Sequence, residues 1–99
     1  MASQSLRVVA RIKALAGKTE ELRLLLKALV EAMRKEVGCL RYDLLQNKQN
    51  FREFTFVEEW KDDAALAAHL SSSHVQEAFR RAPELVAEGP DIRQYAVVS

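Results

Sequence analysis

Apolar side chains recur at every second position in several stretches of this chain, and this repeat constrains the fold more than any other feature. It is clearest in residues 53–60, where four side chains share one side: Phe54, Phe56, Glu58 and Trp60. A period of two residues is typical of a β-strand, because successive side chains point to opposite faces. The sequence predicts four strands, at residues 6–15, 39–46, 53–60 and 91–98.

Two further regions place apolar residues at helical spacing. The first spans residues 19–36, and its apolar stripe consists of Leu22, Leu25, Leu26, Leu29 and Met33. The second begins with a short helix over residues 64–70, which Asp62 or Asp63 can cap. It continues with a helix near His74, because Ser73 and Gln76 have the spacing of a capping box. The predicted order is strand, helix, strand, strand, helix, strand.

This order predicts an α+β fold of the ferredoxin-like kind, a four-stranded antiparallel sheet with both helical regions on one face. The other face carries valine, leucine and tyrosine side chains, and no further element remains to cover it. A second copy of the chain is the simplest cover, and two sheets packed face to face give a dimeric α+β barrel. We therefore expect one domain over residues 1–99 that forms a homodimer, with Asp91–Val98 as an interface segment.

Charge and hydropathy exclude several classes of protein. The chain has 15 Lys+Arg and 14 Asp+Glu, and a net charge of +1 does not fit a dedicated nucleic-acid binder. No stretch approaches the ~18 apolar residues of a membrane span, and the N-terminus lacks the pattern of a signal peptide. A single cysteine, Cys39, excludes an internal disulfide and fits a reducing compartment. We expect a cytoplasmic protein without nucleic-acid or membrane partners.

The sequence also lacks the common signatures of cofactor sites. Its three glycines are far apart, so it contains neither a dinucleotide fingerprint nor a phosphate-binding loop. His69 and His74 are not at a recognised metal-ligand spacing. We therefore expect no metal and no cofactor.

Two histidines are candidate functional residues. His74 lies in the first turn of its helix, where the backbone amides disfavour an imidazolium, so it could act as a base; otherwise it is a solvated surface residue. His69 lies on the apolar side of its helix, where it is either a site residue or a half-buried histidine bonded to the backbone.

Glu58 and Trp60 are candidates on the same side of a strand. A carboxyl group among aromatic residues such as Phe56 has a raised pKa and could move protons; the alternative is an edge residue paired with Arg or Lys. Trp60 is either a core anchor or a platform on which a substrate ring stacks.

Four sequence pieces resemble the antibiotic biosynthesis monooxygenase family in order and spacing. They are G-C-L-R-Y-D-L at Gly38–Leu44, V-E-E-W at 57–60, D-D-A-A-L at 62–66 and H-L-S-S-S-H-V at 69–75. The resemblance covers nearly the whole chain and implies the dimeric ferredoxin-like barrel of that family. It further implies a cavity between sheet and helices, in which characterised relatives oxidise electron-rich phenols and quinols with O₂, without flavin, haem or metal.

The resemblance also suggests roles for residues. Trp60, His69 and His74 match recurrent cavity positions and are the predicted catalytic residues, with His74 as the base, Trp60 stacked on the substrate and His69 bonded to a ring oxygen. Tyr42, which could also bond a ring oxygen, and Glu58 are weaker matches in the substrate-binding set, to which Phe56 and Phe79 are added. Phe79 lies where haem-degrading relatives carry an iron-ligating histidine, and phenylalanine cannot ligate iron.

The predicted function is therefore that of a cofactor-independent monooxygenase acting on a small electron-rich aromatic with O₂. A first alternative is a cofactor-free isomerase or degradative enzyme for a small polar metabolite, for which Arg80, Arg81 and Arg93 could supply a basic pocket. A second is a non-catalytic binding or stress-response dimer, whose cavity would contain no group with a perturbed pKa.

Overall fold

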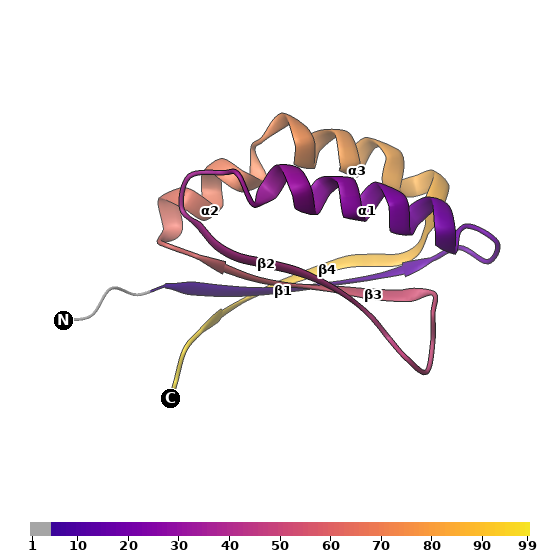
Figure 1. The fold of residues 1–99 in the computed structure, drawn as a ribbon, viewed down its shortest axis with the longest axis horizontal. Helices are drawn as coiled ribbons and strands as arrows, with labels where there is room; N and C mark the ends of the chain where they lie inside the picture. Colours follow the sequence, from indigo (N-terminus) through magenta and orange to yellow (C-terminus); the bar gives the residue numbers. More distant parts are fainter. Residues whose placement is uncertain (1–4) are drawn as a thin grey trace.

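The computed structural model describes residues 5–99 as a sheet covered on one face by helices (Figure 1). The elements in chain order are β1 (Leu6–Ala14), α1 (Thr19–Met33), β2 (Cys39–Gln46), β3 (Glu53–Trp60), α2 (Asp63–Leu70), α3 (Ser73–Leu85) and β4 (Val86–Ala96). In this part of the chain, no helix is both long and apolar enough to cross a membrane.

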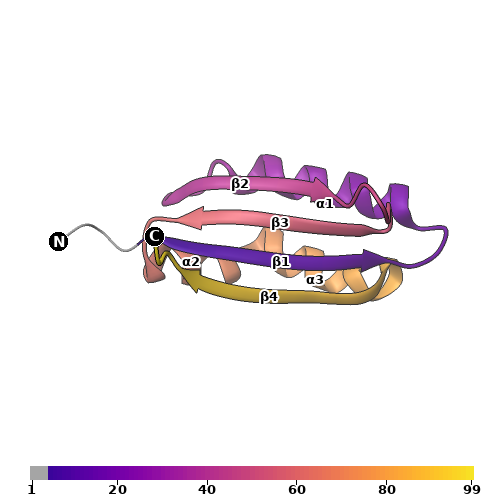
Figure 2. The ribbon, with the colours of Figure 1, turned by 90° about the horizontal axis from the view of Figure 1, so that it is seen from below.

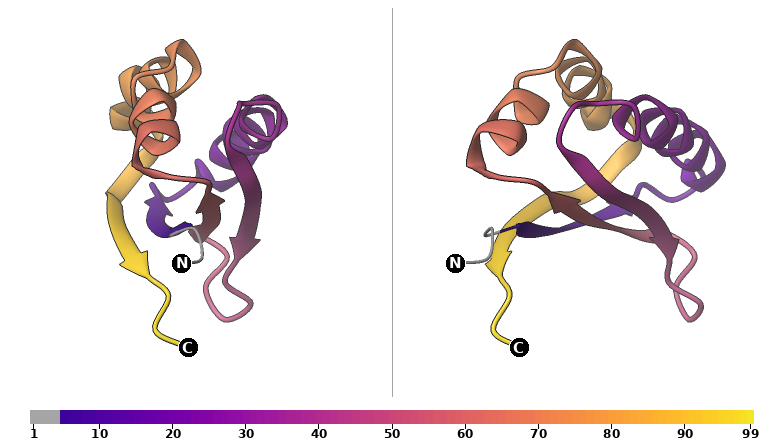
Figure 3. Two further views of the ribbon diagram at one scale, coloured as in Figure 1. Left: turned by 90° about the vertical axis from the view of Figure 1, so that its left-hand side faces the viewer. Right: turned by 60° about the vertical axis from the view of Figure 1, so that its left-hand side comes forward.

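The four strands lie in the order β2-β3-β1-β4, and all neighbours are antiparallel (Figure 2). Ala10 in β1 lies opposite Phe56 of β3 on one side and Ile92 of β4 on the other. All three helices lie on the same face of this twisted sheet (Figure 3). The fold is therefore ferredoxin-like α+β, as the order of periodicities predicts.

The core lies between the sheet and the helices, where the alternation of β3 places its even-numbered side chains. Phe54, Phe56, Glu58 and Trp60 are all buried there, while the residues between them are only partly covered. The leucine stripe of α1 packs on the same side through Leu22 and Leu26, with Val30 and Met33. Full burial of one such apolar side chain stabilises the fold by roughly 1.5–3 kcal/mol.

The turn that follows α1 differs from the prediction, because the helix ends at Met33 and not at residue 36. Residues 34–38 form a turn closed by Gly38, whose φ is +86°. A Cβ at Gly38 would collide with the side chain of Ala65 in α2, so only glycine permits this close approach. The turn is thereby held against α2.

The caps of α2 and α3 follow the predicted residue types with one shift, whereas α1 begins after Lys18 without a side-chain cap. Asp62 caps α2, since its carboxylate accepts the backbone N–H of Ala65 at 2.9 Å. Ser72, not the predicted Ser73, caps α3 by accepting the N–H of Val75 at 3.3 Å. Both serines have the chemistry of a cap, and the extended backbone of Ser72 selects between them.

The last strand also begins earlier than predicted, because β4 runs from Val86 to Ala96 and not over residues 91–98. It contains Gly89 and Pro90, which the sequence suggests as a break. Its pairing with β1 shifts register around Lys13. A proline is tolerated here because β4 is an edge strand. One side of an edge strand forms no hydrogen bonds with another strand, so the N–H that proline lacks is not needed there.

Within residues 5–99 no helix lies over the second face of the sheet (Figure 2). Charged side chains form cross-strand pairs there: Arg7 with Glu59, Arg11 with Glu53 and Lys13 with Glu88. The valines Val9 and Val57 lie opposite each other between these pairs. This face is therefore a mixture of ion pairs and apolar side chains.

Candidate functional site

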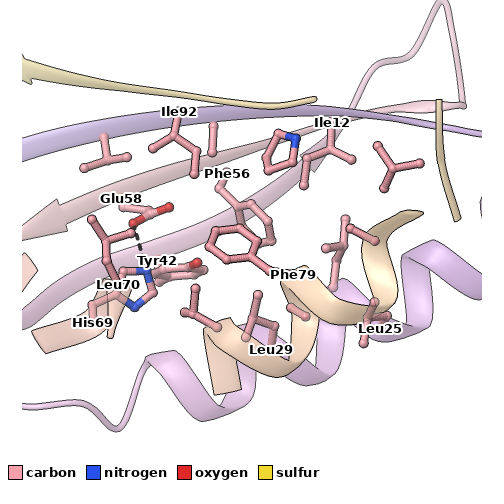
Figure 4. Close-up of a pocket in the computed structure, with 18 of the residues that line it drawn as sticks. Ile12, Leu25, Leu29, Tyr42, Phe56, Glu58, His69, Leu70, Phe79 and Ile92 are labelled. Atoms are coloured by element: carbon pink, nitrogen blue, oxygen red, sulfur yellow. Dashed lines mark ion pairs between the residues drawn. The ribbon is translucent and has the colours of Figure 1, made fainter. Parts of the chain in front are cut away.

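A narrow pocket lies between the sheet and helices α1 and α3 (Figure 4). Its free volume is about 60 Å³ and its walls are mostly apolar, with Ile12, Leu25, Leu29 and Ile92 among the residues that line it. A cavity of about 150 Å³ is known to hold benzene, so an aromatic ligand requires the pocket to widen. Phe79 lines the pocket from α3 and is 39% exposed, so it and the equally exposed Ile92 of β4 are the lining side chains with the most room to move.

Three polar side chains gather at one end of this apolar pocket: Tyr42 from β2, Glu58 from β3 and His69 from α2 (Figure 4). All three are buried. The pocket thus presents one polar end and a long apolar wall. This arrangement suits a flat apolar molecule with an ionisable or hydrogen-bonding group at one edge.

Glu58 carries a buried carboxyl group. The alternation of side chains along β3 directs it toward the helices. Trp60 donates its Nε1–H to Glu58 Oε1 at 2.8 Å, and His69 Nε2 lies 3.7 Å from the same oxygen. Burial raises the pKa of Glu58 to about 7, although hydrogen bonds from Trp60 and Tyr42 oppose that rise. Glu58 therefore exchanges its proton near neutral pH, as a general base or acid must.

His69 is fixed by one ring nitrogen and by one ring face. Its Nδ1 lies 3.0 Å from Glu36 Oε1, and its ring stacks on Trp60 with centroids 4.4 Å apart. Burial lowers the pKa of His69, while the neighbouring Glu36 carboxylate opposes that change. The network assigns the Nδ1 proton to the bond with Glu36, which leaves the Nε2 lone pair directed to Glu58.

Tyr42 completes the polar end as a hydrogen-bond donor. Its ring packs edge-on against His69 at 5.6 Å and tilted against Phe56 at 5.2 Å. Burial, together with the nearby Glu58, raises the pKa of Tyr42 well above its usual range. The phenol hydroxyl therefore keeps its proton and can donate to a ligand oxygen.

The structure brings five of the seven candidate residues into the pocket wall: Tyr42, Phe56, Glu58, His69 and Phe79. Trp60 is fully buried and lies behind Glu58 and His69, outside the wall. Its contacts are those of a residue that positions Glu58 and His69, so the predicted stacking on a substrate finds no support in this geometry.

His74, the predicted base, lies on the exposed side of α3 and does not line the pocket. The reason is helical periodicity, because the residues of α3 that line the pocket are Val75, Ala78, Phe79 and Ala82. His74 precedes Val75 directly in the helix, so its side chain points away from the pocket. Glu58, for which the sequence analysis predicts a raised pKa, is instead the buried proton acceptor at the pocket.

Glu36 is the residue that the sequence reasoning missed. It lies in the turn after α1, far from His69 along the chain, and only the tertiary structure joins the two. The one local sign was its position two residues before Gly38, a glycine that permits the turn to approach α2 closely.

Among residues 5–99, no cluster of three or more His, Cys, Asp or Glu side chains is arranged to hold a metal ion. The basic residues considered for a polar metabolite, Arg80, Arg81 and Arg93, are exposed and do not line the pocket.

The chain belongs to the antibiotic biosynthesis monooxygenase family, whose model matches residues 5–81. It is 30% identical over 90 residues to "Uncharacterized protein sll1783" of Synechocystis, an alignment covering 91% of this chain but only 61% of that protein. It is 32% identical over 83 residues to "Putative monooxygenase YcnE" of Bacillus subtilis, covering 84% and 87% of the two chains.

Among solved structures, protein SO0527 from Shewanella oneidensis is similar, with a TM-score of 0.90 and 35% identity over 97% of this chain and 93% of that one. The resemblance found in the sequence and the ferredoxin-like α+β fold predicted for the chain are thus confirmed. Family membership supports a monooxygenase-like or small-molecule-binding function.

Proposed function

We propose that this protein is a cofactor-independent monooxygenase that oxidises a small electron-rich phenol or quinol with O₂. The observation that carries the proposal is Glu58, a buried carboxyl group with a pKa of about 7 at the polar end of an apolar pocket. A non-catalytic binding protein has no need of such a group, and its desolvation costs stability.

The first step is removal of the phenol proton by the Glu58 carboxylate. Tyr42 donates a hydrogen bond to the resulting ring oxygen, and Phe56 and Phe79 contact the ring. A phenolate is a far stronger reductant than a phenol, so deprotonation allows the substrate itself to pass electrons to O₂. The apolar walls keep water away from the reactive intermediates.

The overall reaction balances without any added reductant. A phenol with a hydrogen at the para carbon and one O₂ give the para-quinone and one H₂O. One oxygen atom forms the new C=O, the other leaves as water with the two hydrogens of the substrate, and the substrate supplies all four electrons. The site needs only to bind, deprotonate and shield its substrate.

The apolar walls favour this substrate class over a small polar metabolite. Of the side chains from residues 5–99 that line the pocket, three are polar and none is Lys or Arg. A sugar phosphate or similar molecule would need cationic or hydrogen-bonding groups along its length. The isomerase alternative therefore has less support than the oxygenase.

We also propose that the domain works as a cytoplasmic homodimer in which the second sheet face meets its counterpart. Val9 and Val57 supply apolar contact there, and the flanking ion pairs can exchange partners with a second copy. Light scattering coupled to gel filtration should give twice the mass of one chain, and Val57→Lys should shift the mass toward one chain. A monomeric wild-type protein would contradict this arrangement.

The oxygenase proposal is tested with 1-naphthol in the presence of ¹⁸O₂. We expect 1,4-naphthoquinone with one labelled oxygen, no product under argon, and a Glu58→Gln variant at least 100-fold slower, as for loss of a general base. The control is Glu59→Gln, the same change on the opposite face of β3. Equal product under argon, unlabelled quinone, or an unimpaired Glu58→Gln variant would each reject the mechanism.

A further inference from the structure

Three ionisable side chains form a line from the pocket to the protein surface. Glu58 and His69, both in the pocket wall, are each 4% exposed, whereas Glu36 at the outer end is 23% exposed. His69 separates the two carboxyl groups, at 3.7 Å from Glu58 and 3.0 Å from Glu36. The line therefore joins a buried carboxyl group to one that reaches water.

The fold holds the outer end of this line in place. The turn that carries Glu36 is fixed to α2 by the close approach of Gly38 to Ala65. The turn is also bonded to the connection between β3 and α2, where the backbone N–H of Lys61 donates to the Gly38 carbonyl at 2.8 Å. Trp60 fixes the inner end, since it donates to Glu58 and stacks on His69.

The chemistry of the line allows a proton to pass in both directions. A protonated Glu58 faces the lone pair of His69 Nε2, while His69 Nδ1–H is bonded to the Glu36 carboxylate. If Nε2 accepts a proton as Nδ1 releases one, a protonated Glu58 and an ionised Glu36 become an ionised Glu58 and a protonated Glu36. The 3.7 Å gap at Glu58 requires a small rotation of its carboxyl group.

We propose that Glu36 and His69 form a proton path that exchanges the proton of Glu58 with solvent. This inference rests on the proposed function. The substrate proton is held outside the pocket while the phenolate meets O₂, and it returns to complete the water that leaves. Glu36 acts through His69 and is a positioning and proton-carrying residue, not one that contacts substrate.

Other groups around the line are placed differently. From β2, Tyr42 contacts His69 as a protonated phenol, and Cys39 is near both carboxyl groups, with its pKa raised by burial. Arg34, in the turn, pairs with Asp43 and donates to the Tyr42 carbonyl. Glu36 is the carboxylate bonded to the His69 ring, and it opposes the lowering of the His69 pKa by burial.

The decisive variants are Glu36→Gln, Glu36→Asp and the control Glu31→Gln on the exposed side of α1. Glutamine can still accept the His69 Nδ1–H but cannot take up a proton. We expect Glu36→Gln to lower kcat for 1-naphthol at least tenfold, with KM within twofold, and to increase the solvent deuterium isotope effect on kcat. Glu36→Asp should recover part of the loss, and Glu31→Gln should match the wild type.

A second readout is independent of catalysis. In ¹⁵N NMR spectra of the substrate-free protein, we expect the neutral His69 ring to carry its proton on Nδ1, and its pKa to fall further in Glu36→Gln because a favourable carboxylate is lost. Unchanged kcat in Glu36→Gln, or a His69 proton on Nε2, would overturn the proton path. If instead the wild type oxidises no phenol while the NMR results hold, the proposed function fails and the Glu36–His69 link stands.

Discussion

The buried carboxyl group of Glu58 should make the free energy of unfolding of this protein depend on pH. The substitution Glu58→Gln should remove that dependence. In the folded state the pKa of Glu58 is about 7, against a usual value of 4.5. Below the lower value the group is neutral in both states, and burial costs little. As pH rises between the two values the unfolded chain ionises first, so the folded state loses stability progressively.

The size of this loss follows from the two pKa values. The interval from 4.5 to about 7 corresponds to about 3 kcal/mol at roughly 1.36 kcal/mol per pH unit. Glu58→Gln keeps the shape of the side chain but cannot ionise, so it escapes the loss. We compare the free energy of unfolding of the variant with that of the wild type at each pH. The variant-minus-wild-type difference should be about 3 kcal/mol larger at pH 8 than at pH 4.

The assay is urea unfolding of both proteins at pH 4 and pH 8, at one protein concentration so that association contributes equally. His69 also titrates in this range, but it is present in both proteins and largely cancels in the difference. Glu59→Gln, on the other face of the same strand, is the matched control and should show no such trend. A difference between Glu58→Gln and wild type that is the same at both pH values would refute the reasoning.

Three further outcomes follow from the site. Trp60→Phe removes the donor to Glu58, so the pKa of Glu58 should rise and the pH profile of kcat/KM should move to higher pH; an unmoved profile contradicts this. Phe79→Ala should widen the pocket and lower KM for 1-naphthol at least threefold, and an unchanged KM would show that Phe79 does not limit entry. His74→Ala should keep kcat within twofold, because His74 lies outside the pocket; a tenfold loss would restore it as the base.

Much of the fold could be predicted because it depends on local periodicity. The strict alternation of β3 is enough to place Phe54, Phe56, Glu58 and Trp60 on one face, and the bounds of β2 and β3 match the prediction. Errors occurred where local signals compete. Two adjacent serines could each cap α3, and Gly89-Pro90 suggests a break that an edge strand can accommodate.

The site was predictable only in part, and the two histidines show why. Both lie in a helical region beside apolar residues, and the sequence favoured His74 because of its place in a first turn. The tertiary structure reverses this ranking, since α2 directs His69 into the pocket and α3 directs His74 to solvent. A shift of a single residue in a helix changes the direction of a side chain by about 100°, so small errors in a boundary matter greatly here.

By itself, then, the sequence determined the order of the strands and helices along the chain, which residues of a strand share a face, and the family, because these depend on repeats and motifs within short segments. Only the tertiary structure decided which polar groups meet. Glu36, His69 and Glu58 come from a turn, a helix and a strand, and their contact arises because a glycine allows that turn to press against α2. The pKa of Glu58 has the same origin, since it reflects the removal of water by side chains that are distant in the sequence.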